Sequence, residues 1–173
     1  MKEVEVKARA SLEDVRRKLT KLGARRIRVE VQEDLYFSHP CRDFAESDEA
    51  LRLRVVGGEV ELTYKGPREP GRVKSRVEVT VRLDDLERAL AILSYLGFKE
   101  LATVKKLREV YVLNDVEVCL DRVEGLGEFV EVESRGASSR ELVELLEELG
   151  AGELVAETYL ELVLRRSSTP PNS

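Results

Sequence analysis

Small apolar residues alternate strictly with charged ones in residues 2–10, a period-2 pattern that predicts a strand with one apolar and one charged face. A stripe of leucines at helical spacing follows and ends at Gly23. The same sequence of alternating strand, leucine stripe and terminal Leu-Gly returns in residues 74–97 and 131–150. This repeat predicts an α+β fold built from three similar β–α units.

The segments between these units also alternate or end in turn residues. We expect strands at 25–31, 33–37, 98–113, 116–122 and 154–164, and a hairpin of 50–56 and 59–65 turned by Gly57-Gly58. The three helices are predicted to begin at Ser11, at Asp84 or Asp85, and at a Ser138/Glu141 capping box. With adjoining segments such as 25–31 and 33–37 counted as one strand, we expect eight to nine strands, and in each unit the apolar face of the strand is expected to pack under the following helix.

Composition excludes several classes of function. The formal net charge of −5 disfavours a nucleic-acid binder, and no stretch approaches the roughly 20 apolar residues of a membrane span. We therefore expect a cytoplasmic protein that binds neither nucleic acid nor membrane. The single histidine, His39, lies in an expected loop, and Cys41 and Cys119 lack metal-ligand spacing. Any chemistry is left to carboxylates, Lys, Arg and hydroxyls.

The charged faces of the strands carry acids and bases that are separated by strand. Glu3 and Glu5, Arg52 and Arg54, and Glu131 and Glu133 each place like charges ~7 Å apart, which costs about 2 kcal/mol per pair at an effective dielectric near 20. One interpretation is an open sheet with a solvated face, where Arg and Glu pair across strands. The other is an enclosed interior where divalent cations bridge the acids and a polyphosphate bridges the bases.

Motifs along nearly the whole chain carry a family resemblance. They run in order as Glu3-Val-Glu5-Val-Lys7, Gln32-Glu-Asp34-Leu-Tyr36-Phe37, Leu51-Arg52-Leu-Arg54, Leu62-Thr-Tyr64-Lys65-Gly66-Pro67, Arg76-Val-Glu78, Lys105-Lys106-Leu-Arg108-Glu-Val-Tyr111 and Asp121-Arg-Val-Glu-Gly125-Leu-Gly127-Glu128-Phe129-Val-Glu131-Val-Glu133. This set resembles the CYTH superfamily, which includes class IV adenylate cyclases and thiamine triphosphatases. The Leu-Gly-Glu-Phe-Val-Glu-Val-Glu run is most similar to the adenylate-cyclase-type branch.

The resemblance implies a closed, mainly antiparallel eight-stranded β-barrel, a triphosphate tunnel with helices packed outside. It implies Mg²⁺ or Mn²⁺ as cofactor, with metal ligands Glu3, Glu5, Asp121, Glu131 and Glu133. The implied phosphate ligands are Lys7, Arg52, Arg54, Lys65, Arg76, Lys106 and Arg108, with Glu78 beside them, and the implied catalytic residues are Glu5, Lys7, Arg54 and Glu131. Many relatives continue R-x-E-x-E where this chain has Thr80, so one carboxylate is missing.

The resemblance leaves three functions open. A cyclase would convert ATP into cyclic AMP and pyrophosphate, a triphosphatase would hydrolyse an inorganic or organic triphosphate, and a binding module would do neither. The cyclase is favoured, and the lack of Trp makes a thiamine ring the less favoured substrate. The partner is then a nucleoside triphosphate or inorganic triphosphate, with a homodimer as a possible assembly.

The domain is expected to span residues 1–164, followed by a disordered tail, 165–173, rich in Ser and Pro. Four glutamates and Asp121 in one interior would repel one another unless they were protonated or bound to metal. Removing one of these acids is therefore expected to raise the melting temperature of the metal-free protein.

Overall fold

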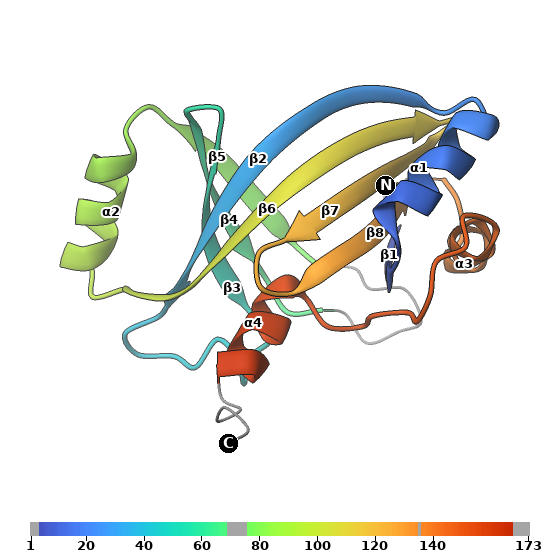
Figure 1. The fold of residues 1–173 in the computed structure, drawn as a ribbon. Helices are drawn as coiled ribbons and strands as arrows, with labels where there is room; N and C mark the ends of the chain where they lie inside the picture. Colours follow the sequence, from blue (N-terminus) through green and yellow to red (C-terminus); the bar gives the residue numbers. More distant parts are fainter. Residues whose placement is uncertain (1–3, 69–75, 135, 168–173) are drawn as a thin grey trace, which may run out of the picture. The chain divides into compact units, whose positions relative to one another are not determined.

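The computed structural model describes residues 4–68, 76–134 and 136–167, which form eight strands and four helices (Figure 1). In chain order the elements are β1 (Val4–Arg9), α1 (Leu12–Lys21), β2 (Arg25–Ser38), β3 (Ala50–Val56), β4 (Glu59–Lys65), β5 (Glu78–Leu83), α2 (Leu86–Tyr95), β6 (Lys99–Leu113), β7 (Val116–Val123), β8 (Gly127–Ser134), α3 (Ser139–Glu148) and α4 (Tyr159–Ser167). The predicted α+β class is confirmed.

The strands form one sheet in the order β1-β8-β7-β6-β2-β3-β4-β5. The pairs β1–β8, β8–β7, β7–β6, β2–β3, β3–β4 and β4–β5 are all antiparallel. Within the described residues β1 and β5 are the end strands of this order, so hydrogen bonds do not close the sheet. The expected closed barrel is thus not confirmed.

The described residues fall into two compact units. The first contains residues of 4–30 and 106–158, and the second contains residues of 31–68, 76–105 and 159–167. The long strands β2 and β6 contribute residues to both units.

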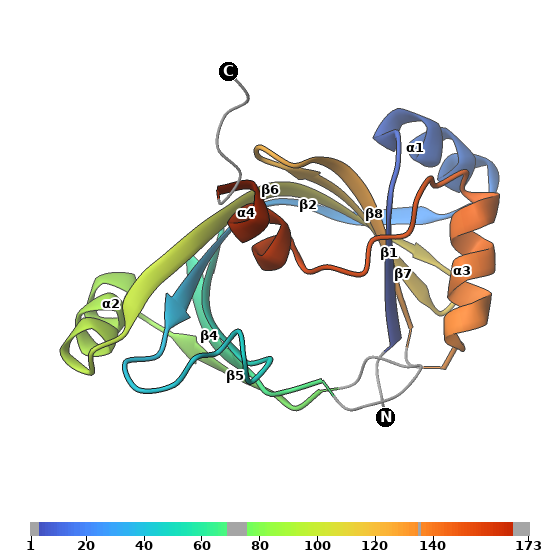
Figure 2. The same cartoon turned by 90° about the horizontal axis from the view of Figure 1, so that it is seen from below.

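Helices α1 and α3 cover the apolar face of the strands in the first unit. Helix α1 begins at the predicted N-cap Ser11, and α3 begins at the predicted capping box of Ser138 and Glu141. Both helices lie beside β1 and β8 in Figure 2. Their leucines close a core with the valines of β7 and β8, whose fully or almost fully buried members include Leu19, Val118, Leu120, Val130, Leu142 and Leu146. The first and third β–α units therefore pack as the sequence predicted.

The middle β–α unit packs differently. Helix α2 begins at Asp85 and buries Ala89 and Leu93 against a core of β2, β3 and β4 that includes Phe37, Leu51, Leu53 and Val60. The apolar side chains of β5 stay exposed, with 61% of Val79 and 52% of Val81 accessible. The expectation that α2 would cover this strand face is wrong, because the apolar stripe of α2 packs on the neighbouring strands instead.

The hairpin of β3 and β4 turns at Gly57 and Gly58, whose φ angles of +57° and +90° suit glycine, as predicted. The two strands expected between residues 25 and 37 are one strand, β2. The expected final strand at 154–164 is wrong: only Leu154 makes an isolated bridge, to Ala8, and α4 follows.

The sequence of α4 explains this error. The apolar run from Leu162 to Leu164 fits a strand or a helix equally well, whereas Glu161 in the first turn and Arg165 and Arg166 in the last turn complement a helix dipole. The helix includes the first three residues of the predicted tail, and residues 168–173 lie outside the described part of the chain.

Candidate functional site

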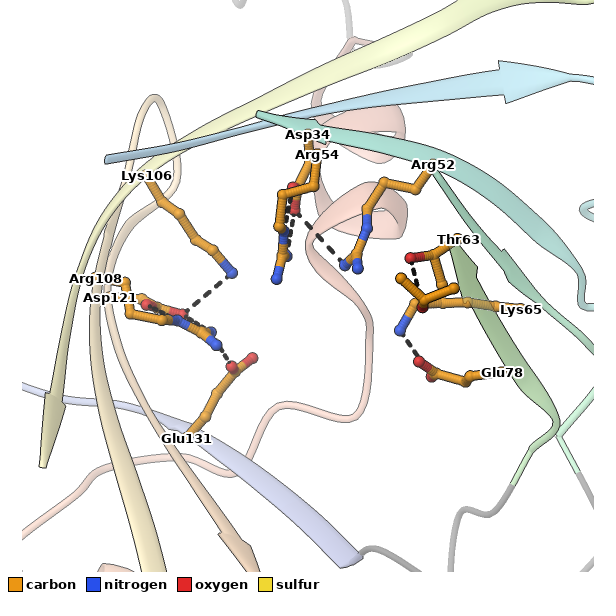
Figure 3. Close-up of polar contacts among 11 residues, drawn as sticks. Asp34, Arg52, Arg54, Thr63, Lys65, Glu78, Lys106, Arg108, Asp121 and Glu131 are labelled. Carbon is orange, nitrogen blue, oxygen red and sulfur yellow. Dashed lines mark hydrogen bonds and ion pairs between the residues drawn. The ribbon is translucent and has the colours of Figure 1, made fainter. Parts of the chain in front are cut away.

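The first unit carries a buried group of five charged side chains, the first charge cluster, on the strand face opposite its helices (Figure 3). Strand β1 contributes a lysine, β6 a lysine and an arginine, β7 an aspartate and β8 a glutamate, namely Lys7, Lys106, Arg108, Asp121 and Glu131. Figure 3 labels all of these except Lys7. Asp121 is fully buried, and Lys106, Lys7 and Glu131 are 5%, 7% and 8% exposed. These four side chains are therefore largely shielded from solvent.

Arg108 lies at the centre of the cluster. It donates two hydrogen bonds to Asp121, from Nε to Oδ1 at 2.7 Å and from Nη2 to Oδ2 at 2.5 Å, and a third to Glu131. The amine of Lys106 lies 3.6 Å from Asp121 Oδ2, and that of Lys7 lies 3.7 Å from Glu131 Oε1. The cross-strand pairing of acids and bases, one of the two sequence-based interpretations, is therefore present.

Electrostatics keep these groups charged. Burial alone would raise the pKa of Glu131, but the positive charge of Arg108, with those of the two lysines, lowers it to about 2. Burial also disfavours a charged guanidinium, yet Glu131 and Asp121 raise the pKa of Arg108 well above its ordinary value. The expected mutual repulsion of the acids is thus wrong for Glu131 and Asp121, because cations already neutralise both.

Cys119 lies on the same face of β7 as Asp121, beside the first charge cluster. It lies directly opposite Glu131 in the β7–β8 register and is 2% exposed. Burial, reinforced by the neighbouring carboxylates, raises the pKa of its thiol. Cys119 is therefore a neutral thiol at physiological pH and not a reactive thiolate.

The second unit carries the second charge cluster, which consists of Asp34, Arg52, Arg54, Lys65 and Glu78 (Figure 3). Arg54 holds the buried Asp34 with a bidentate pair of hydrogen bonds, at 2.6 Å from Nε and 2.7 Å from Nη2. Arg52 Nη1 is 3.9 Å from the same carboxylate. Arg52 also lies near the hydroxyl of Tyr36, whose pKa is raised by burial and then by the charge of Asp34.

Lys65 completes this cluster. Its Nζ donates to Glu78 Oε1 at 2.7 Å, and burial together with the charge of Arg52 lowers its pKa. The charge of Arg76 acts on Lys65 in the same direction. Lys65 therefore lies in surroundings where burial and two neighbouring cations outweigh the single carboxylate of Glu78.

The structure brings together most of the residues predicted from the sequence. The predicted phosphate ligands of the first unit lie in its cluster, and those of the second unit lie in or beside the other one. Glu5 is exposed at the surface of β1, opposite the half-buried Glu133, and Glu3 lies outside the described residues. Of the predicted metal ligands, only Asp121 and Glu131 are in the first charge cluster.

The register of the first unit decides whether its acids fit a divalent metal. Glu5 on β1 is opposite Glu133 on β8, which is opposite Glu117 on β7, so three carboxylates occupy one row. Carboxylate oxygens are ligands that Mg²⁺ and Mn²⁺ prefer, and like charges directly opposite one another favour a counter-cation. In the part of the chain that the structure describes, no three acids converge on a point that could hold a metal. The carboxylates therefore fit such an ion in chemistry, but the described side chains are not placed as a metal-binding group.

Three residues of the second unit lie on the polar face of its strands, although the sequence analysis gave them no role in the site. Asp34 was quoted as part of a motif, but its role as the buried partner of Arg54 follows only from the β2–β3 register. Thr63 and Tyr36 lie on the same polar face as Arg52, to which both are opposite across the strands. The alternation of Gln32, Asp34 and Tyr36 on β2 was the available signal for this face.

Comparison with known proteins identifies the family. The chain matches the CYTH domain over residues 1–159. It is 39% identical to a Methanocaldococcus jannaschii protein named "Putative adenylate cyclase MJ0240" over 171 residues, which cover 92% of this chain and 98% of the relative. The chain therefore belongs to the CYTH family, as the motifs indicated.

Solved structures agree with this assignment. A Pyrococcus horikoshii protein is 40% identical with a TM-score of 0.82, and the alignment covers 95% of this chain and 99% of that one. A Hippeastrum protein, 19% identical with a TM-score of 0.71 over 99% and 98% of the chains, shares the fold. Among the described residues, no helix is long and apolar enough to cross a membrane.

Proposed function

We propose that this protein is a metal-dependent enzyme that acts on a triphosphate, with ATP cyclisation as the favoured reaction. The observation that carries this proposal is the burial of six cations at the CYTH motif positions, in a chain whose net charge is −5. The exposed fractions of their side chains lie between 3% and 21%, for Lys7, Arg52, Arg54, Lys65, Lys106 and Arg108. Each cluster contains three cations and two carboxylates, so positive charge remains that an anionic ligand would neutralise.

The cations have the chemistry that a polyphosphate requires. A guanidinium presents a planar fork of N–H donors that matches two phosphate oxygens, and a lysine ammonium adds a compact charge. Phosphoryl transfer depends mostly on positioning and on neutralising charge as it develops. We assign the cations of each cluster to binding phosphate groups and to neutralising negative charge that develops on them.

The acids of the first unit have a different role. Glu5 and Glu133 would hold Mg²⁺ or Mn²⁺, which when bound supplies further charge neutralisation at the phosphates. Because its pKa is about 2, Glu131 stays ionised at neutral pH and is a poor acceptor for the proton of an attacking hydroxyl. Its contribution is to hold Arg108 and Lys7 in place.

A triphosphatase is the second candidate function. The same cations would serve either reaction, since only the nucleophile differs: the ribose 3′-hydroxyl attacks the α-phosphorus in a cyclase, and water attacks the terminal phosphorus in a hydrolase. The Hippeastrum protein that shares the fold is described as an adenylyl cyclase homologue with a dominant triphosphatase activity. The relative from M. jannaschii, which is far more similar in sequence, bears a cyclase name, and we therefore favour the cyclase.

Arg52→Ala tests whether these cations bind phosphate. Loss of a charge-assisted hydrogen bond of about 1.5–3 kcal/mol corresponds to a roughly tenfold to hundredfold weaker affinity for inorganic triphosphate. The dependence of affinity on salt concentration should become shallower, because one cation fewer contributes. Isothermal titration calorimetry at several salt concentrations measures both quantities.

Arg88→Ala is the matched control, since Arg88 belongs to the same unit, is highly exposed and pairs with Asp85, the N-cap of its own helix. It should leave triphosphate affinity unchanged. If Arg52→Ala and Arg88→Ala bind inorganic triphosphate as the wild type does, the second charge cluster is not a phosphate site.

A further inference from the structure

The register of β2 to β5 arranges the polar side chains of the second unit in rows that run across the strands. One row consists of Tyr36, Arg52, Thr63 and Thr80, each opposite the next. Residues directly opposite each other in antiparallel strands lie on the same face with their Cβ atoms about 5 Å apart. Arg52 is therefore the only charged residue in its row, and its row neighbours are hydroxyls.

The two adjacent rows are balanced in charge. On one side, acids and bases alternate across the four strands, in the order Asp34, Arg54, Glu61 and Arg82. On the other side, Lys65 is opposite Glu78 and donates to it. In contrast, the row of Arg52 contains no negative charge that would balance the charge of Arg52.

The contacts of Arg52 agree with this imbalance. Asp34 is 3.9 Å away and already accepts two hydrogen bonds from Arg54. The buried Nε of Arg52 has no hydrogen-bond partner among the described residues. A buried N–H without an acceptor is rare in a folded protein and is expected where a ligand oxygen is bound.

The residue at position 80 determines whether the row of Arg52 contains a carboxylate. The hydroxyl of Thr80 lies 2.9 Å from that of the buried Thr63, and either oxygen can be the donor. The family pattern often has glutamate at this position, and a glutamate here would place a carboxylate in the row of Arg52. With threonine, three cations and two carboxylates leave the second charge cluster with a net charge of +1.

We propose that Thr80 is a specificity-determining residue, which keeps this cluster positive so that it binds a phosphate group directly and without a divalent cation. This inference rests on the proposed triphosphate function and adds to it how the second unit binds phosphate. In this unit Arg52, Lys65 and the threonine hydroxyls bind the phosphate group. A hydroxyl at position 80 can donate to a phosphate oxygen, which a carboxylate cannot do.

The test measures binding of inorganic triphosphate by calorimetry, once with EDTA and once with MgCl₂. The wild type should bind in both. Thr80→Glu should bind about tenfold more weakly in EDTA, since a negative charge is added beside the phosphate. Mg²⁺ should recover most of this loss by bridging the new carboxylate and the phosphate, so that Thr80→Glu becomes metal-dependent.

Val81→Glu is the matched control, because it adds the same charge one residue along β5, at a position that is exposed as Thr80 is but lies on the opposite face of the strand. It should bind within twofold of the wild type. Glu78→Gln changes the cluster charge by the same amount in the other direction and should tighten binding in EDTA. This second variant gives an answer even if Thr80→Glu does not fold.

The outcomes separate this inference from the function on which it rests. If the wild type binds triphosphate only with Mg²⁺, or if Thr80→Glu and Val81→Glu behave alike, the role of Thr80 is contradicted and the triphosphate function remains. If the wild type binds no triphosphate under either condition, both are wrong.

Discussion

Arg108→Ala is expected to lower the free energy of unfolding by about 3–5 kcal/mol, because it leaves two buried carboxylates without their shared cation. Arg108 donates to both Asp121 and Glu131, and Asp121 is fully buried. Removal of the side chain beyond Cβ also leaves a cavity among the buried groups, and this cavity adds to the loss of stability. Urea denaturation monitored by circular dichroism measures the difference.

Arg122→Ala is the control for this prediction. Arg122 also lies on the sheet of the first unit and pairs with one glutamate, Glu128, but its side chain is 62% exposed. Exposed ion pairs contribute little, so a loss of no more than about 1 kcal/mol is expected. Equal losses for Arg108→Ala and Arg122→Ala would contradict the assignment of the first charge cluster as a buried, tightly coupled network.

Glu131→Gln is expected to reduce turnover about hundredfold or more while leaving the protein folded at neutral pH. The variant removes the charge that fixes Arg108 and Lys7, and a small displacement of groups that stabilise a transition state has a large effect on rate. Steady-state kinetics with ATP measure the loss. The matched control is Glu144→Gln, an exposed helical glutamate paired with Arg140, which should retain full activity.

Glu131→Gln is also expected to change how the stability of the folded protein depends on pH. The pKa of Glu131 falls from an ordinary value of 4.5 to about 2 on folding, so ionised Glu131 stabilises the folded state at every pH above about 4.5. That stability is lost as the pH falls from about 4.5 towards about 2, and it amounts to roughly 3 kcal/mol. Glu131→Gln should flatten the stability profile in this window.

The contacts of Glu131 also determine how Glu131→Gln changes the melting temperature. Removal of an acid was expected to raise the melting temperature of the metal-free protein, on the assumption that the acids repel one another. Glu131 has three cations around it, so Glu131→Gln should lower the melting temperature at neutral pH. A higher melting temperature for Glu131→Gln would show that repulsion between acids dominates after all.

Local sequence patterns were sufficient to predict much of the fold. Capping by Ser11, Asp85 and Ser138, the Gly57-Gly58 hairpin and the alternation of the strands are short-range signals, and the structure contains each of them. The motif residues were sufficient to identify the family. These signals depend on neighbours in sequence, which is why they survive without knowledge of tertiary contacts.

What the sequence did not predict depends on register and packing between distant segments. That Lys7 is opposite Glu131, and Asp34 opposite Arg54, follows from how strands far apart in the chain align. The same holds for Thr63 and Thr80, whose contact joins β4 to β5. The exposed valines of β5 and the helix at α4 were missed because tertiary packing, not periodicity, selects between equally plausible local patterns.

Product analysis tests the central claim most directly. The wild-type protein would be incubated separately with ATP, inorganic triphosphate and thiamine triphosphate, each with Mg²⁺ or Mn²⁺, and the products separated by anion-exchange chromatography. We expect cyclic AMP and pyrophosphate from ATP, in equal amounts, and no product when the metal is chelated. Orthophosphate without cyclic AMP would replace the cyclase by the triphosphatase, and no turnover of any triphosphate with either metal would contradict the account.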